Sequence, residues 1–425
     1  MSGCSNGVSA EDRLERTRDQ RTAAVLAVLA GALLLGLALR AAARAESRNT
    51  GDFTHFYLAA KAVREGDDPM ASGIGGYIYP PLLAVLLAPL SLISELSAAR
   101  AWIVVNVALI AITLGLGARV LAREWGERSA ARLAGATLLG LALTLEPLRW
   151  ELELGQTDTI VLLGMLGALA CPARRPSAAG VCLGIAANVK YVALAALPWM
   201  LVRGRWRAAA WTIAGAVAVA LAPAIVLGWE RNLDFLRRAL GGLAGSMGVA
   251  QRAAGDAAPH GLTWHRSVSL TSFAGRAAEA WGLGSAGTLA ITGSLLGLAL
   301  AAVTLVYHAR GESFLRPRRE HALTEWCAVV MGLLIFAPQT TTRHMYLMLV
   351  PNVAAALLLL TPGRGRWPLL AGVVAFQLAT RLPPGGDAFK DAVEAWRWMS
   401  GASWGLLAML LGFVAVGLRR SGGAR

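Results

Sequence analysis

Long apolar runs separated by short polar turns fill most of the chain. Runs that reach or approach the roughly 20 residues needed to cross a bilayer occupy 22–44, 101–121, 131–147, 157–171, 206–228, 285–307, 321–338, 345–361, 366–383 and 401–418. Three shorter runs, 78–93, 177–189 and 190–202, fit either short spans or half-helices. The pattern therefore predicts an all-α polytopic membrane protein with about 12–13 hydrophobic helices.

The first run resembles a signal peptide, but its long polar lead over residues 1–21 favours a retained anchor. Composition supports the membrane class: 56% of the 425 residues are hydrophobic, 16% are charged, and the mean hydropathy is +0.53. This excludes a soluble enzyme and a disordered or fibrous chain, because an ordinary core cannot bury so much apolar surface. Cys4, Cys171, Cys182 and Cys327 are scattered without metal-like spacing.

A net charge of +14 would suggest a nucleic-acid partner in a soluble chain. In a membrane protein, the basic residues must first be assigned to one side of the membrane or the other. We therefore expect no nucleic-acid partner. If the N-terminus is cytoplasmic and the run 78–93 does not cross, 22 of the 40 Lys and Arg residues fall in seven inner segments. The short outer turns then carry only Arg149, Lys190 and Arg343. Such asymmetry is typical of inner-membrane topology.

This arrangement predicts about 12 spans, cytoplasmic tails at 1–21 and 419–425, and one integral domain over 22–418 in the cell membrane. The outer loops are then 45–77, 229–284 and 384–400. In the alternative topology 78–93 crosses and 177–202 forms one span, which places basic turns outside. Long loops are the expected working surface, so we expect the site on the extracytoplasmic side.

Asp52 directly follows the first span and precedes a mildly amphipathic stretch over 53–65, which predicts an interfacial helix. Asp52 could simply cap that helix, which is the commoner role for an aspartate there. Alternatively it is a general base at the lip of a cavity, with His55 one turn away. The pair Asp67-Asp68 could bind a divalent cation, but a solvated turn is the commoner reading.

Other polar residues collect in the same outer segments. The turn 146–158 holds four acids, and Gly155 lets the backbone near Gln156 approach a ligand. Lys190 lies between two short apolar runs, where it could snorkel to headgroups or neutralise a lipid phosphate. Arg343 and His344 begin a span, so anchoring competes evenly with an active role. The remaining outer candidates include Arg266 and Arg276.

In their order along the chain, these blocks resemble glycosyltransferase family 87 of the GT-C superfamily. The first block comprises Asp52-Phe53, Tyr57, Ala59-Ala60, Gly66, Tyr79-Pro80-Pro81-Leu82 and Pro89-Leu90. The central block comprises Gly155-Gln156, the run 180–187, Lys190, Pro198 and Arg205-Trp206-Arg207. The later block comprises Ser269-Leu270, Arg276, Pro338, Arg343-His344 and Pro351. Collinearity over roughly residues 50 to 355 is the strong part of the resemblance.

The resemblance implies a GT-C-type fold and transfer of a hexose, with mannose as the usual sugar, from a polyprenyl monophosphate. The acceptor would be a glycolipid, a glycan or a protein. Asp52 matches the family's base, which takes the acceptor proton as the anomeric carbon is attacked with inversion. The expected catalytic residues are Asp52 and His344. The expected substrate-binding residues are His55, Tyr79, Gln156, Lys190, Arg266, Arg276 and Arg343.

No cofactor or metal is expected, because a monophosphate leaving group lessens the need for one. The main alternative is a lipid or sugar transporter. A transporter would place ionisable residues near mid-span and often show two related halves. Here the ionisable residues collect on one side and the halves look dissimilar, which favours an enzyme.

Overall fold

The computed structural model describes residues 10–47, 50–72, 77–171, 174–247, 260–317, 321–362, 365–381 and 390–420. All regular elements in these ranges are helices, so the predicted all-α class is confirmed. Parts of the predicted tails and outer loops, including 1–9, 248–259, 382–389 and 421–425, lie outside the described residues. Residues 10–21 of the predicted N-tail continue the first helix rather than forming a separate tail.

Within the described residues, five helical segments are long and apolar enough to cross a membrane: Glu11–Ser47 within α1 (Ala10–Ser47), α4 (Glu95–Trp125), the segment Trp206–Leu227, α14 (Gly284–Ala309) and Gly401–Arg419 within α19 (Gly401–Arg420). Trp206–Leu227 comprises α10 (Trp206–Leu221) and α11 (Ala224–Leu227). A sixth span is possible if α5 (Ala130–Leu143) and α6 (Leu145–Leu154) count together, although they are bent by 69°. The predicted run 131–147 is thus broken at Thr144.

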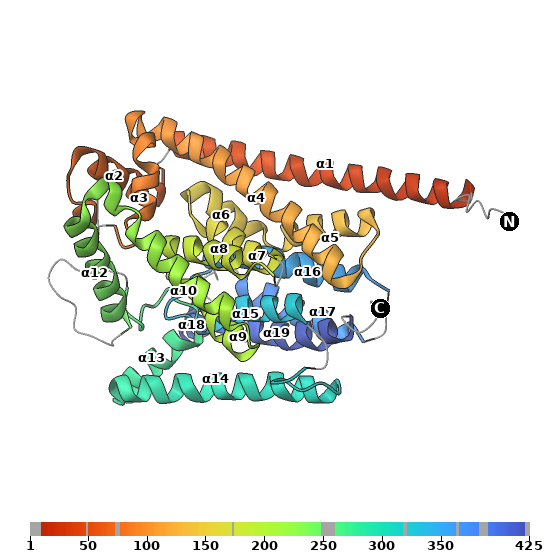
Figure 1. Cartoon of the computed structure of the whole chain (residues 1–425). Coiled ribbons are helices and arrows are strands. Elements are labelled where there is room, and N and C mark those ends of the chain that lie inside the picture. Colours follow the sequence, from red (N-terminus) through yellow and green to blue (C-terminus); the bar gives the residue numbers. More distant parts are fainter. Residues whose placement is uncertain are drawn as a thin grey trace.

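Many of the other predicted spans are shorter apolar helices. They are α7 (Asp158–Ala170), α8 (Pro176–Val189), η3 (Tyr191–Ala195) with α9 (Ala196–Val202), α15 (Ala322–Phe336), η4 (His344–Met348) with α16 (Leu349–Leu360), and α17 (Trp367–Thr380). Helix α16 is buried from Leu349 to Leu358 and forms the centre of the core. Helices α1 and α14 are mostly exposed at the periphery, where apolar side chains would meet lipid (Figure 1).

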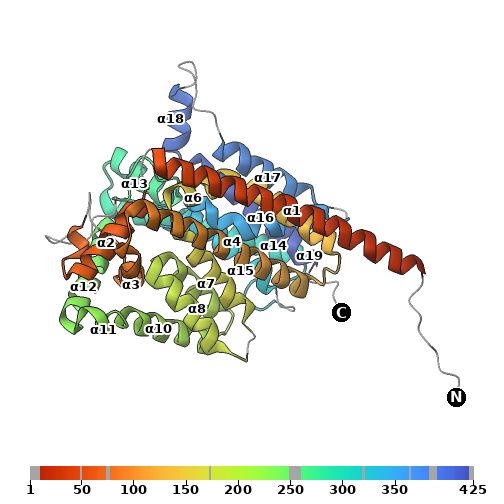
Figure 2. The ribbon, with the colours of Figure 1, turned by 90° about the horizontal axis from the view of Figure 1, so that it is seen from above.

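The remaining elements gather at one end of the bundle, which we call the site end (Figure 1). They are α2 (Phe53–Glu65), η1 (Pro69–Ala71), α3 (Leu82–Leu87), η2 (Ala88–Leu92), α12 (Trp229–Ser246), α13 (Leu270–Ala280) and α18 (Lys390–Trp398). At the opposite end, the tail end, α1 begins and α19 ends. Figure 2 shows that α18 stands out from the bundle beside α17.

Hydrogen bonds tie the predicted outer segments together at the site end. Arg231 of α12 donates to the carbonyl of Asp67 at 2.8 Å, and Arg276 of α13 donates to the carbonyl of Trp398 at 2.7 Å. At the tail end Arg310, just after α14, donates to the carbonyl of Ala415 in α19 at 2.9 Å. The segments that charge asymmetry assigned to opposite sides therefore lie at opposite ends of the molecule.

The run 78–93 leaves and rejoins the bundle at the site end, as the preferred topology assumes. Thr54 in α2 donates to the carboxylate of Glu95, the first residue of α4, at 2.7 Å. The hydroxyl of Tyr57 also donates to the carbonyl of Ile93 at 2.9 Å. Between these points, α3 and η2 pack against α2.

The short helices leave room for a cavity above them. At a rise of 1.5 Å per residue, α4 is about 46 Å long and α7 only about 20 Å. Their last turns meet at the tail end, where Arg123 donates to the carbonyl of Ala170 at 3.1 Å. Asn106, about 16 Å along α4 from its first residue, donates to the carbonyl of Gln156 at 3.3 Å. The first residues of α7 therefore lie deeper in the bundle than the first residues of α4.

Candidate functional site

A cavity of about 1070 Å³ opens at the site end of the bundle. The start of α2, the segment 77–79, α6 and two loops, 260–268 and 339–345, form much of its wall. The facing wall comes from α17, α18 and the start of α19. Apart from Lys190 and Arg276, every residue that the sequence predicts for the site lines this cavity.

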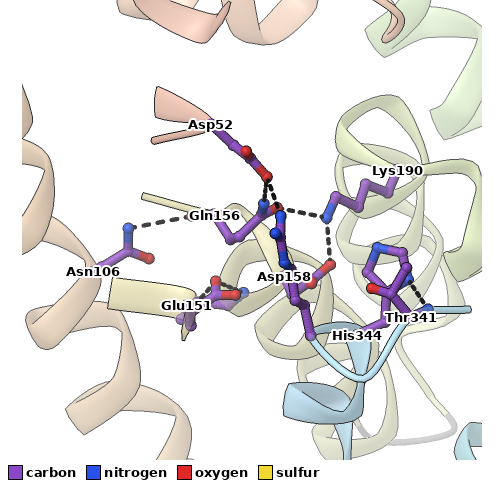
Figure 3. A network of polar contacts seen from close by, with 10 residues as sticks. Asp52, Asn106, Glu151, Gln156, Asp158, Lys190, Thr341 and His344 are labelled. Carbon is purple, nitrogen blue, oxygen red and sulfur yellow. Dashed lines mark hydrogen bonds and ion pairs between the residues drawn. The ribbon is translucent and has the colours of Figure 1, made fainter. Parts of the chain in front are cut away.

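Asp52 occupies the N-cap position of α2 but does not cap it, because its side chain makes no hydrogen bond to the helix. Its Oδ2 atom instead accepts a hydrogen bond from Gln156 Nε2 (Figure 3). The same oxygen accepts a second hydrogen bond from Arg343 Nη1 at 3.2 Å. The carboxylate is 39% exposed and lines the cavity. Of the two interpretations of Asp52, the geometry favours a carboxylate held for work in the cavity over a helix cap.

Gln156 connects Asp52 to a buried ion pair. Its Oε1 atom accepts a hydrogen bond from Lys190 Nζ at 3.3 Å, and Nζ also donates to Asp158 Oδ1 at 2.7 Å. Lys190 and Asp158 are both buried, and Lys190 is not among the residues that line the cavity. The structure thus pairs Lys190 with a carboxylate of the protein, whereas the sequence predicts it as a ligand for phosphate.

Lys190 reaches this position because α8 ends at Val189 and the backbone becomes extended at residue 190. The sequence allowed the runs 177–189 and 190–202 to be either two short helices or one continuous span. The structure shows a break between them at residue 190. Asp158 is the first residue of α7, where a negative charge is favoured by the helix dipole.

The loop that carries Arg343 and His344 is held by backbone pairing with a distant segment. Val268 N donates to the carbonyl of Thr340 at 2.6 Å, and Thr340 N donates to Ser267 Oγ at 3.1 Å. His344 Nδ1 accepts a hydrogen bond from the backbone N–H of Thr341 at 3.2 Å. In the neutral imidazole the proton then resides on Nε2, which makes His344 a hydrogen-bond donor on the cavity wall.

Aromatic residues shape the cavity beside Asp52. The Arg343 guanidinium lies 5.8 Å from the ring centroid of Trp150. The sequence does not predict Trp150 as a site residue. Tyr79 lines the cavity, and burial raises the pKa of its phenol, so the hydroxyl stays neutral and can donate. His55 also lines the cavity, one turn after Asp52, and its Nδ1 atom is buried without a hydrogen-bond partner.

Three exposed arginines line the cavity from three separate elements: Arg266 in the loop before α13, Arg381 at the end of α17, and Arg397 in α18. None of them forms an ion pair with a carboxylate among the described residues, although Arg381 donates to the carbonyl of Ala142 at 3.3 Å. Of these, the sequence predicts only Arg266. We call the three residues the arginine wall.

Arg276 lies elsewhere: it does not line the cavity with the other predicted substrate-binding residues. It is buried and donates to the backbone carbonyls of Trp264, at 3.2 Å, and Ser267, at 3.3 Å. It also donates to the carbonyl of Trp398, at 2.7 Å, and to Ser400 Oγ, at 2.8 Å. Arg276 therefore fastens the loop that carries Arg266 to the end of α18, which carries Arg397.

Among the described residues there is no group of three or more His, Cys, Asp or Glu side chains that could hold a metal ion. In the Asp67-Asp68 pair, Asp68 accepts from the backbone N–H of Met70 at 2.8 Å and pairs with Arg238 at 2.8 Å. This geometry fits a capped turn, the commoner of the two readings of the pair.

The sequence signal for the missed residues is weak. Asp158 was visible as one of four acids in the turn 146–158, but nothing in the sequence singled it out. Trp150 is one of 14 tryptophans in the chain, and nothing in the sequence distinguishes it from the others. Arg381 precedes the predicted outer loop 384–400, and Arg397 lies within it. Only the packing of α17 and α18 brings both side chains to the cavity.

Comparisons with known proteins yield relatives at low identity. An α-(1→3)-arabinofuranosyltransferase of Corynebacterium glutamicum is 30% identical over 163 residues, which is 37% of this chain and 38% of that protein. A polyprenol-phosphate-mannose-dependent α-(1-2)-phosphatidylinositol mannoside mannosyltransferase of Mycolicibacterium smegmatis is 25% identical over 363 residues, 80% of this chain and 76% of that protein. Against the arabinofuranosyltransferase the chain thus spans little more than a third of the relative's length.

Among solved structures, ArnT from Cupriavidus metallidurans bound to undecaprenyl phosphate aligns with 93% of this chain and 77% of that chain. The identity is 16% and the TM-score is 0.41.

The family model named "Glycosyltransferase family 87" matches residues 77–338, which is more than half of the chain. That range includes the Tyr79-Pro80-Pro81 segment, the Gln156 turn, Lys190 and the Arg266 loop, all of which the structure places around one site. The resemblance seen in the order of the sequence blocks is confirmed, and the chain belongs to glycosyltransferase family 87.

Proposed function

We propose that the protein transfers a hexose, with mannose as the first candidate, from a polyprenyl monophosphate to an acceptor hydroxyl, with inversion at the anomeric carbon. The observation that carries the proposal is Asp52, a carboxylate that leaves its helix uncapped and faces a cavity. Two donors, Gln156 and Arg343, hold one oxygen of this carboxylate, Oδ2. Among the described residues, its Oδ1 atom receives no hydrogen bond and is free to accept a substrate hydroxyl.

In this mechanism Asp52 takes the proton from the acceptor hydroxyl as that oxygen attacks the anomeric carbon. The bond from that carbon to the phosphate oxygen breaks on the opposite face, and polyprenyl phosphate leaves with the electron pair. Positive charge near the leaving oxygen stabilises the negative charge that grows in the transition state. We assign that role to the arginine wall, because Lys190 is committed to Asp158 and Arg343 to Asp52.

The donor lipid has an apolar route into the cavity. Leu143 and Pro147, near the bend between α5 and α6, line it on one side, and Phe376 and Ala379 of α17 line it on another. Side chains of this kind suit isoprene units, while the arginine wall holds the phosphate and the sugar lies toward Asp52. His344 and Tyr79 supply hydrogen-bond donors for sugar hydroxyls.

The names of the relatives support this choice of substrates. The Mycolicibacterium smegmatis relative is named as a polyprenol-phosphate-mannose-dependent phosphatidylinositol mannoside mannosyltransferase. A glycolipid is therefore the first acceptor to test, ahead of a glycan or a protein. The proposed chemistry calls for no divalent metal, since cationic side chains serve the monophosphate. The distribution of basic residues supports a site on the extracytoplasmic side of the cell membrane.

The test is a transfer assay with purified protein, radiolabelled polyprenyl phosphate mannose and a panel of membrane glycolipids. Wild-type protein should release polyprenyl phosphate and label an acceptor, while Asp52→Asn should lose at least about a thousandfold in turnover, within the range for a missing base. Equal turnover by both proteins would refute Asp52 as the base. Absence of turnover with any lipid-linked sugar would point instead to a transporter.

A further inference from the structure

The buried pair of Lys190 and Asp158 lies behind the proposed base and does not line the cavity. Among the described residues, its only hydrogen-bonded link to Asp52 is Gln156, whose side-chain amide bridges Lys190 Nζ and Asp52 Oδ2 (Figure 3). We propose that Lys190 and Asp158 act as one positioning unit that orients the amide of Gln156 toward the base. The inference rests on the proposed transferase function.

The chemistry of the three side chains gives the unit a definite task. A glutamine amide has an acceptor end and a donor end of almost equal size, and it can rotate by 180°. With its oxygen toward Asp52 it would repel the carboxylate. An ammonium group only donates hydrogen bonds, so Lys190 can pair only with Oε1. The amide is thereby forced to present Nε2 to Asp52.

The backbone around Gln156 is held independently of Lys190. Its carbonyl accepts from Asn106 at 3.3 Å, and the carbonyl of Gly155 accepts from Trp102 Nε1 at 3.0 Å. The backbone N–H of Gln156 donates to the carbonyl of Glu151 at 2.9 Å. Removing Lys190 together with Asp158 should therefore leave these backbone hydrogen bonds in place and free only the side-chain amide.

Asp158 completes the unit by holding Lys190. Its Oδ1 atom accepts from Nζ at 2.7 Å, and both side chains are more than nine-tenths buried. An unpaired buried charge is strongly destabilising, so neither charge can be kept without the other. Together the two charges cancel, so the unit can direct the amide without placing a net charge behind the base.

The experiment compares turnover in a double-mutant cycle. The first arm removes both charges, Lys190→Met with Asp158→Leu, in the wild-type background and in a Gln156→Ala background. In wild type we expect the pair change to lower kcat about 10- to 100-fold, with the KM for polyprenyl phosphate mannose changed less than twofold. In the Gln156→Ala background the same change should lower kcat less than threefold, because the amide it acts through is gone.

Two further variants leave the pair's charges in place and do not depend on the fold tolerating the pair change. Lys190→Arg keeps a donor and a charge, and should retain kcat within about fivefold. Gln156→Asn has the same amide on a shorter side chain that cannot bridge Lys190 and Asp52, and should be as slow as Gln156→Ala. The matched control replaces another buried ion pair near the tail end, in which Arg203 Nε lies 2.7 Å from Glu325 Oε2. Arg203→Met with Glu325→Leu should keep kcat within threefold in folded protein.

Three results would overturn the inference. The first is an equal loss of kcat from the pair change in both backgrounds. The second is a rise in donor KM with unchanged kcat, which would make Lys190 a phosphate ligand. The third is full activity of Gln156→Asn. In each case wild-type protein would still transfer sugar and Asp52→Asn would not. The proposed function would then be supported, and the proposed role of Lys190 and Asp158 would be refuted.

Discussion

At the scale of single residues, local sequence rules name the commonest role of a side chain, and the fold decides otherwise. Asp52 stands where an aspartate usually caps a helix, yet its carboxylate turns to Gln156 and Arg343. The sequence predicts Lys190 and Arg276 as substrate-binding cations. In the structure, Lys190 pairs with the carboxylate of Asp158, and Arg276 donates to backbone carbonyls. The cations left for a phosphate are those without an acidic partner.

This elimination predicts the donor site. Arg381→Gln and Arg397→Gln should each raise the KM for polyprenyl phosphate mannose about tenfold, because a charge-assisted hydrogen bond contributes about 1.5–3 kcal/mol. The KM for the acceptor should stay within twofold. The measurement is steady-state transfer with each substrate varied in turn.

The matched control for these two variants is Arg237→Gln in α12. Its side chain is 66% exposed and does not line the cavity, so both KM values should be unchanged. If Arg381→Gln and Arg397→Gln raised the acceptor KM and spared the donor KM, the arginine wall would belong to the acceptor.

At the scale of elements, the functional residues lie where short helices begin or break. Gln156 follows the end of α6, Lys190 follows α8, and His344 starts η4. Gly155 makes the first of these turns possible, since it adopts φ +63° at the end of α6. A Cβ atom there would lie 2.7 Å from the Cβ of Phe53, the residue after Asp52.

Gly155→Ala should therefore damage both the fold and the site. The left-handed backbone costs about 1–2 kcal/mol with a side chain, and the contact with Phe53 adds to that and displaces the start of α2. We expect a lower thermal unfolding midpoint and at least a tenfold loss of turnover.

Gly66→Ala is the comparison for this variant, because Gly66 also has a positive φ, +80°, but no atom lies within 4 Å of its Cβ position. It should show only the backbone cost and keep its turnover. Equal behaviour of the two variants would show that the contact with Phe53 is unimportant.

At the scale of the whole molecule, the cavity lies at the site end. The predicted inner loops lie toward the opposite end, where α1 begins (Figure 1). Sidedness follows from basic residues alone, so it stays a prediction. In a cysteine-free background, Glu230→Cys at the site end should react with a membrane-impermeant maleimide in intact cells.

Glu124→Cys, near the tail end in α4, should react only after the membrane is permeabilised. Both positions are polar and solvent-accessible enough to carry a label. The reverse pattern would place the cavity on the cytoplasmic side and contradict the proposed topology.

The pattern of apolar and polar positions determined a large part of the architecture. It predicted the all-α class, the helix over 53–65, the break at Lys190 and the return of 78–93 to the end of the bundle from which it starts, because each depends on residues close in the sequence. It overestimated the continuity of 131–147, since a 69° bend at Thr144 is decided by packing and not by hydropathy. It also left several short helices, among them α7, α15 and α17, undistinguished from full spans.

What only the tertiary structure decided is the pairing of charges. Asp52 and Arg343 are 291 residues apart, and Lys190 and Asp158 are 32 apart. An ionisable side chain inside an apolar protein takes the nearest partner in space, because an unpaired charge there is costly. The sequence by itself determined which polar residues reach one end of the bundle. Only the fold decided which of them neutralise one another and which remain for a substrate.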